Sequence, residues 1–257
     1  MMVKKQPRTL PWLDVAEDFP PVSSAWGHDD PAPGLLAAGA ALNVATLIQS
    51  YSQGIFPWFS ENQPVLWWSP DPRMVLKISD FKLHKSLRKR LIHFLNDPCC
   101  QIRFDSAFDQ VIQACAGKSR SGQPGTWIVP AMVEAYGALH KAGHAHSVET
   151  WVGGELAGGL YCVNLGAMVF GESMFAHQTD ASKIALAALV AFCRANHVTM
   201  IDCQQNTRHL ASLGATEISR DDFIVHIEEN VQKPAPTWQF DNVYWHQLMV
   251  ARSLPVS

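Results

Sequence analysis

Residues 144–176 constrain the fold most, because they alternate extended apolar runs with very short glycine-containing turns. The runs HAHSVETWV, ELAGGLYCVNL and MVFGESMF are separated only by GG and GA. Strand-forming runs joined by turns this short pair as antiparallel hairpins. The segment therefore predicts a hairpin-rich antiparallel sheet.

The flanking segments predict helices that pack on this sheet. Residues 82–95 place Leu83, Leu87, Leu91 and Phe94 on one stripe of a helix. Asp180 precedes the strongest helical segment and is expected to cap it. Further helices are expected at 106–117, 130–143 and 206–214, and further strands at 100–105 and 198–205. This order suits an α+β fold, with helices packed on a sheet.

The N-terminal third follows a different pattern. Residues 43–53 predict a short helix that Asn43 opens and Gly54 stops. Residues 54–73 hold four prolines and three tryptophans, which favours short strands and rigid turns. We therefore expect a small N-terminal domain over residues 1–80 and a larger domain over residues 81–257.

The composition excludes several classes of protein. Apolar residues make up 47% and charged residues 17%, so most of the chain is expected to fold around a core. A net charge of −3 excludes a strongly basic nucleic-acid protein, but not a local basic patch. The most apolar helical stretch, residues 184–193, is too short for a membrane span, and no targeting signal is visible. The six cysteines show no C-x-x-C spacing, which favours buried thiols in a reducing cytoplasm.

Motifs for cofactors and metals are not found. The chain has no G-x-G-x-x-G and no Walker loop, so a nucleotide cofactor has no support. His140, His144 and His146 have no acid or cysteine at ligand spacing, and H-E-x-x-H is missing. We expect core or hydrogen-bonded histidines and no metal site.

A basic stretch begins the second domain. Its cations crowd into nine positions without an acid: Lys82, His84, Lys85, Arg88, Lys89 and Arg90. Most of them point away from the apolar stripe, where they repel one another mildly. An RNA would relieve that repulsion, because phosphate contacts release counterions. An ordinary solvated face remains the alternative.

Three polar residues stand in apolar surroundings. Glu172 lies within MVFGESMF, where a carboxylate is costly unless it is paired. It either binds a cationic ligand or forms a structural salt bridge, with Lys183 or Arg208 as candidate partners. Asp202 and Gln204 lie two apart at the end of a strand, so they are expected on one face. They either accept hydrogen bonds from an incoming amine, or Asp202 caps the following helix.

Taken in order, these segments resemble the leucyl/phenylalanyl-tRNA–protein transferase family. The matching segments are GLLAAGAALNVATLIQSYSQGIFPWFS, LWWSPDPR, HKSLRK, GTWIVPAMVEAYGALHKAGHAHSVE, GGLYCV, FGESMF, DASKIAL, IDCQ and HLASLGA. They run in family order over about residues 34–226, whereas the N-terminal 25 or so residues and those after about 230 match poorly. The resemblance implies a small N-terminal domain and a C-terminal domain like GCN5-related N-acetyltransferases (GNAT-like), with a mixed, largely antiparallel sheet.

The resemblance also implies a reaction. Leu or Phe is transferred from its tRNA to the α-amine of a protein that begins with Arg or Lys, which marks that protein for degradation. The ester of the charged tRNA is already activated, so no ATP, metal or cofactor is needed, and the enzyme positions the substrates and moves a proton. The implied partners are Leu-tRNA, Phe-tRNA and the acceptor protein, with no DNA and no membrane. A monomer in the cytoplasm is expected.

Residue roles follow from matched positions. Asp202, acting through Gln204, would orient the amine and accept its proton, and Glu172 would hold the acceptor's cationic group. A relay through the ribose hydroxyl of the tRNA is the alternative. The remaining matches are Trp58 and Trp127 at the terminal adenosine, Leu160, Met174 and Leu186 around the transferred side chain, and Lys82, Lys85, Arg88 and Lys89 at the acceptor stem. Packing in the core is the alternative for the tryptophans and for the three apolar residues.

Two rival functions remain open. An N-acetyltransferase of the same fold would need backbone N–H groups in a glycine-rich turn for the pyrophosphate of acetyl-CoA. The corresponding segment, GESMFAHQTDAS, has no glycine cluster, and Glu172 and Asp180 would repel phosphate. A non-catalytic RNA-binding module would explain the basic helix, but not the three polar residues.

Overall fold

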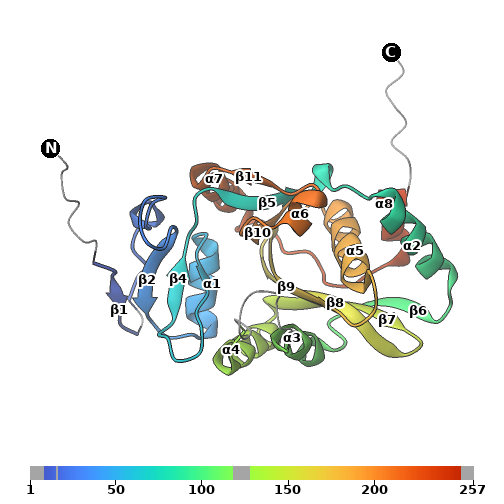
Figure 1. The fold of residues 1–257 in the computed structure, drawn as a ribbon, viewed down its shortest axis with the longest axis horizontal. Helices are drawn as coiled ribbons and strands as arrows, with labels where there is room; N and C mark the ends of the chain where they lie inside the picture. The colour runs from blue at the N-terminus through green and yellow to red at the C-terminus, as the bar shows by residue number, and fades with distance from the viewer. Residues whose placement is uncertain (1–8, 16, 118–127, 250–257) are drawn as a thin grey trace, which may run out of the picture.

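The computed structural model describes residues 9–15, 17–117 and 128–249, and Figure 1 shows their arrangement. The N-terminal part forms a small four-stranded sheet beside helix α1 (Val44–Ser52). In spatial order the strands are β1 (Trp12–Leu13), β2 (Leu35–Gly39), β4 (Leu66–Trp68) and β3 (Phe56–Pro57). Helix α1 begins as expected, because Asn43 Oδ1 accepts a hydrogen bond from the backbone N–H of Thr46 at 3.0 Å.

The main sheet has seven strands in the order β11, β5, β10, β9, β8, β7, β6. Their bounds are β11 Thr216–Ile218, β5 Arg73–Lys77, β10 Met200–Gln204, β9 Met168–Ala176, β8 Glu155–Leu165, β7 Ala145–Val152 and β6 Cys100–Phe104. Neighbouring strands run antiparallel except β9 and β10, which run parallel. This mixed, largely antiparallel sheet confirms the expected α+β class.

Helices cover both faces of the main sheet (Figure 1). Along β8, Tyr161 packs with Phe108 in a core on one face, whereas Leu160 packs with Leu186 in a core on the other. Helices α3 and α4 lie on the first face, and α5 lies on the second. No helix in the described part of the chain has the length and apolar character needed to cross a bilayer.

The helices keep close to their expected positions. Their bounds are α2 Lys85–Asn96, α3 Phe108–Ala116, α4 Pro130–Lys141, α5 Ala181–Ala195, α6 Arg208–Ser212, α7 Arg220–Asn230 and α8 His246–Met249, with short 3₁₀ helices at η1 Val22–Ser24, η2 Ile78–Asp80 and η3 Asn242–Trp245.

The start of α5 differs from the expectation in its chemistry. Asp180 occupies the capping position, but it has a left-handed φ of 66° and makes no capping hydrogen bond. Its carboxylate instead contacts Lys183 Nζ at 2.8 Å and Arg90 Nε at 3.7 Å. The Asp180 side chain therefore interacts with two nearby cations and not with the N–H groups of the helix.

The change from the small sheet to the main sheet falls between Trp68 and Arg73. Strand β5 lies within the range expected for the N-terminal domain, yet it pairs with β10 and β11 of the main sheet. The division at residue 80 stays a prediction, and sheet membership changes a few residues before it.

Candidate active site

The candidate site lies where the parallel strands β9 and β10 stop pairing. Val169 pairs with Ile201 and Phe170 with Asp202, and within the described residues this ladder ends there. Each strand also carries a bulge, since the register skips Glu172 on β9 and Cys203 on β10. Bulges redirect side chains and are common beside active sites. Here the two bulges lie on neighbouring strands at the same place.

A pocket of about 490 Å³ opens at this point. It contains all three residues expected around the transferred side chain, Leu160 from β8, Met174 from β9 and Leu186 from α5. Glu172 and Asp202 line the same pocket. The structure therefore brings the expected apolar residues and the two expected carboxylates together.

Glu172 is the centre of the polar part of the site. Its Oε1 accepts hydrogen bonds from the Tyr51 hydroxyl at 2.7 Å and from Gln204 Nε2 at 2.8 Å. Its Oε2 accepts a weaker bond from the Tyr136 hydroxyl at 3.3 Å. Burial raises the pKa of Glu172 to about 7, although the tyrosine hydrogen bonds oppose the shift. This carboxyl group can therefore gain and lose a proton near neutral pH.

Sequence reasoning missed the two tyrosines. Tyr51 comes from α1 and Tyr136 from α4, and their hydroxyl oxygens lie 2.5 Å apart. Both side chains are fully buried. Burial, followed by the nearby Glu172, raises the pKa of each tyrosine well above its usual value, so both remain hydrogen-bond donors. The only signal in the sequence was a tyrosine on the buried side of each expected helix.

Asp202 is fully buried and lies against Arg73 of β5. Arg73 Nε donates to Asp202 Oδ1 at 2.8 Å, and Arg73 Nη2 donates to Oδ2 at 2.7 Å. Asp202 Oδ1 also accepts the backbone N–H of Gln204 at 2.8 Å. Both carboxylate oxygens are thus occupied, an arrangement that suits a role in orienting Gln204 better than direct contact with substrate.

The i, i+2 alternation expected for Asp202 and Gln204 does not hold. Cys203 is an extra residue between them, and Gln204 has a left-handed φ of 62°. The bulge turns the Gln204 side chain towards Glu172, while Asp202 points to Arg73. The two residues still act as a pair, because the backbone N–H of one binds the carboxylate of the other.

Within the described residues, the structural partners expected for the two carboxylates are not found. Among the described residues Glu172 forms no ion pair with Lys183, which binds Asp180 instead. Arg208 lies in α6 and makes no described contact with Glu172. Asp202 does not cap α6, since the side chain of Thr207 does so by accepting from the Leu210 N–H at 3.2 Å.

The expected tryptophan pair is seen only in part. Trp58 follows β3 and packs against Trp68, with ring centroids 5.3 Å apart. Its side chain is partly exposed, and it is not among the residues that line the pocket. Trp127 lies outside the described residues. The role of both residues at the terminal adenosine stays a prediction.

The expected basic cluster lies at α2 but is not uniform. Lys82, Lys85 and Lys89 are exposed. Arg88 is partly buried, and its Nη2 donates to the Met249 carbonyl oxygen at 3.0 Å. The three lysines are therefore free to meet a polyanion, whereas Arg88 also holds the C-terminal helix α8.

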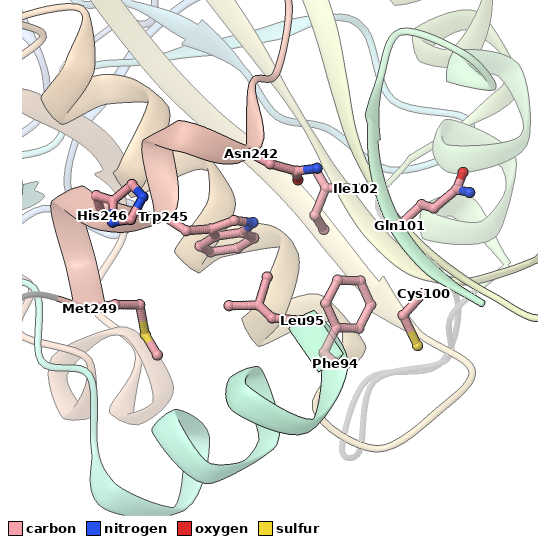
Figure 2. A pocket seen from close by; sticks show the side chains of 9 residues that line it. All are labelled: Phe94, Leu95, Cys100, Gln101, Ile102, Asn242, Trp245, His246 and Met249. Carbon is pink, nitrogen blue, oxygen red and sulfur yellow. The ribbon is translucent and has the colours of Figure 1, made fainter. Parts of the chain in front are cut away.

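A second pocket of about 700 Å³ lies away from these groups, between α2, β6 and the C-terminal segment (Figure 2). None of the expected site residues lines it. Its walls carry no carboxylate, lysine or arginine: Phe94, Leu95, Cys100, Gln101, Ile102, Asn242, Trp245, His246 and Met249. The chemistry expected of the chain therefore points to the smaller pocket.

His140 and His146 make structural contacts in the described part of the chain. His146 Nδ1 lies 2.7 Å from Asp105 Oδ2, and the His146 ring stacks on Trp238. His140 Nδ1 lies 2.7 Å from the Ala145 carbonyl oxygen. Within the described residues, no three or more His, Cys, Asp or Glu side chains are placed to hold a metal ion together.

Known proteins supply a separate line of comparison. A family model described as leucyl/phenylalanyl-tRNA protein transferase matches residues 75–228, and the model of its N-terminal domain matches residues 40–71. A leucyl/phenylalanyl-tRNA–protein transferase from Polaromonas sp. (strain JS666) is 72% identical, covering 96% of this chain and 97% of its own. One from Albidiferax ferrireducens is 61% identical, covering 98% of this chain and 99% of its own.

Among solved structures, L-PGS from Bacillus licheniformis is similar, with a TM-score of 0.35 and 10% identity, covering 69% of this chain and 57% of that one. The family models meet between residues 71 and 75, where sheet membership also changes. On the extent of these matches, the chain is a member of the leucyl/phenylalanyl-tRNA protein transferase family of enzymes.

Proposed function

We propose that the chain transfers leucine or phenylalanine from aminoacyl-tRNA to the α-amino group of proteins that begin with Arg or Lys. Membership of the transferase family supports the donor and the class of reaction. One observation carries the mechanism: three hydrogen-bond donors converge on Glu172 beside an apolar pocket. The product would begin with Leu or Phe and so be marked for degradation.

The pocket would bind the side chain of the transferred amino acid. Leu160, Met174 and Leu186 offer apolar walls, and a methionine adapts its shape to either Leu or Phe. Such a pocket rejects β-branched Val and Ile through shape alone, which is worth about 1–3 kcal/mol per methylene-sized difference.

Glu172 would receive the proton of the attacking amine. An α-amine has a pKa of about 7.7–8.0, so a carboxylate with a pKa of about 7 is closely matched to it. The amine nitrogen then attacks the ester carbonyl carbon, and the bond from that carbon to the ribose oxygen breaks. Glu172 passes its proton to the leaving ribose oxygen, takes the second proton from the nitrogen as the amide forms, and releases that proton to solvent. In the alternative route, the neighbouring ribose hydroxyl relays the proton to the leaving oxygen.

Gln204 and Asp202 would orient that amine. Gln204 Nε2 is committed to Glu172, and within the described residues no donor reaches Gln204 Oε1. An ammonium between Gln204 Oε1 and the Glu172 carboxylate would find two acceptors. Asp202 holds the backbone of Gln204 and so fixes the direction of this amide. Asp202 thereby keeps the orienting role expected of it, and Glu172 takes the proton.

The tRNA would lie across the two sheets. Trp58 and Trp127 are proposed to stack on the terminal adenosine, and the lysines at the start of α2 to meet the acceptor stem. We propose that the chain acts as a monomer. Charged tRNA is consumed in the cytoplasm, where we place the reaction. A molar mass in solution well above 28.4 kDa would contradict the monomer.

The deciding experiment is a transfer assay with purified tRNA charged with Leu, Phe, Met or Val, and peptides that differ only in their first residue. We expect transfer of Leu and Phe to peptides beginning with Arg or Lys, and much less transfer of Val. No transfer from any charged tRNA would refute the proposal. Glu172→Gln should raise the KM for the peptide far more than the KM for tRNA; equal losses would exclude its role at the acceptor.

The same preparation separates the rival functions. Calorimetric titration with acetyl-CoA should show no binding, since the segment before α5 lacks a glycine-rich turn for phosphate. A non-catalytic RNA-binding module would bind charged tRNA without forming a peptide bond. Asp202→Ala that keeps the wild-type kcat would refute the orienting role of Asp202.

A further inference from the structure

Arg73 is a charged residue without contact to solvent. Its side chain is 1% exposed, and that of its partner Asp202 is 0% exposed. Its guanidinium lies between the rings of Phe56 and Phe223, 4.8 and 4.6 Å from their centroids. Burying an ion pair costs several kcal/mol of desolvation and is often no more stabilising than an apolar replacement. Stability alone therefore does not explain this arrangement.

The three N–H contacts of Arg73 go to two separate segments. Two of them form the bidentate pair with Asp202, and the third, from Nη1, reaches the Gly54 carbonyl oxygen at 3.2 Å. Asp202 belongs to the bulged strand β10, whereas Gly54 ends the turn that follows α1. One planar group thus fixes the relative positions of a strand and a turn that are far apart in the sequence.

Both segments carry a donor to the same atom. The bulge after Asp202 directs Gln204 Nε2 to Glu172 Oε1 at 2.8 Å. The turn at Gly54 is tied to α1 by the bond from the Gly54 N–H to the Tyr51 carbonyl oxygen, and Tyr51 donates to Glu172 Oε1 at 2.7 Å. Among the hydrogen bonds of the described side chains, only those of Arg73 reach both Asp202 and Gly54.

We infer that Arg73 is a positioning residue, which aligns Gln204 and Tyr51 on Glu172 Oε1 through Asp202 and Gly54. The expected effect of Arg73 on catalysis rests on the proposed function. The alignment of Gln204 and Tyr51 by Arg73 does not. A lysine at this position keeps the positive charge but cannot donate in a planar fork to both carboxylate oxygens and to a carbonyl. Arg73→Lys therefore separates geometry from charge.

The ionisation of Glu172 reports the alignment without any substrate. The groups that face it or influence its charge are Tyr51 from α1, Tyr136 from α4, Arg73 from β5, Asp202 from β10 and Cys162 from β8. Hydrogen bonds to the carboxylate form lower its pKa, so loss of the aligned donors raises that pKa. Carboxyl carbon NMR can follow the titration, with Glu172→Gln used to assign the signal.

The matched control is Arg220→Lys. Arg220 is a partly buried arginine that donates to the Ser69 carbonyl oxygen at 2.9 Å and makes no described contact with the site. We expect Arg73→Lys to raise the pKa of Glu172 and Arg220→Lys to leave it at the wild-type value. An unchanged titration in Arg73→Lys would overturn the inference, even if that variant melts at a lower temperature.

The transfer assay then tests the catalytic consequence. A misplacement of about 1 Å can lower a rate on the order of 10²-fold, so Arg73→Lys should lose kcat to about this extent and keep the KM for tRNA. Loss of activity no larger than in Arg220→Lys would refute this step. If wild-type protein transfers nothing while Glu172 still responds to Arg73→Lys, the proposed function fails and the alignment stands.

A second variant is available should Arg73→Lys not fold. Asp202→Glu keeps both charges but moves the carboxylate by one methylene, which breaks its alignment with Arg73 Nε and with the Gln204 N–H. We expect the same rise in the pKa of Glu172. A titration at the wild-type value would overturn the inference.

Discussion

Replacing Glu172 with Gln should stabilise the protein at alkaline pH. Burial raises the pKa of this carboxyl from 4.5 to about 7 in the folded protein. Between these values the folded state keeps a proton that the unfolded chain releases, so stability falls as the pH rises from 4.5 to about 7 and is constant above that. Gln cannot ionise; its amide oxygen can still accept from the Tyr51 hydroxyl, and its amide nitrogen can donate to the Tyr136 hydroxyl oxygen.

The magnitude follows from the two pKa values. They differ by about 2.5, and each unit corresponds to about 1.4 kcal/mol, so ionised Glu172 costs about 3 kcal/mol of stability. Roughly 1 kcal/mol of this is already lost at about pH 5. The advantage of Glu172→Gln over wild type should therefore grow by between roughly 2 and 3 kcal/mol from about pH 5 to about pH 8.

Urea denaturation at the two pH values measures this difference. Glu155→Gln is the matched control, because it removes an exposed carboxylate on the neighbouring strand β8. The reasoning is refuted if the free energies of unfolding of Glu172→Gln and wild type differ by the same amount at both pH values. If Glu155→Gln shows the same gain in the free energy of unfolding, the gain comes from the change in net charge and not from the site.

Three further outcomes are expected. Replacing Lys85 and Lys89 with Ala should reduce the slope of log affinity for tRNA against log salt by about 2, as expected for two lost phosphate contacts, whereas Arg88→Ala should change it less because Arg88 already holds Met249. Leu186→Phe should fill part of the pocket and lower transfer of Phe more than transfer of Leu in competition assays. Trp58→Ala should raise the KM for tRNA by the equivalent of about 1–3 kcal/mol, whereas Trp58→Phe should keep most of the affinity; a KM unaltered by Trp58→Ala would assign this side chain to packing on Trp68.

Local signals predicted most of the fold. Asn43 before an apolar run, glycines between extended runs and the long apolar helix after Asp180 each act over a few residues, and the structure places an element at each. The pairing of neighbouring strands followed from their short turns. The pairing of β5 with the main sheet was not predictable in this way, because its partners β10 and β11 lie more than 100 residues further along the chain.

Several residues that the structure brings together at the candidate site were expected from the sequence, but their geometry was not. The resemblance supplied Glu172, Asp202 and Gln204, but an ideal strand would have placed the last two side by side. A bulge adds one unpaired residue to a strand, and the alternation of side chains in the sequence does not reveal it. The bulge at Cys203 could therefore not be predicted. Tyr51, Tyr136 and Arg73 were missed because each has an ordinary place in its own segment and gains its meaning only from contacts across the fold.

The charges buried at the site have a thermodynamic consequence for the acceptor. Arg73 and Asp202 form a buried ion pair whose charges offset each other, so Glu172 is the pocket carboxyl group whose ionisation changes the local charge near pH 7. An ammonium entering there is favoured by the ionised carboxylate, and its arrival expels the proton that Glu172 holds below about pH 7. Acceptor affinity should therefore rise about tenfold per pH unit on the acidic side of that value and level off above it. Proton release on peptide binding, seen as a buffer-dependent heat, would be the calorimetric sign of this linkage.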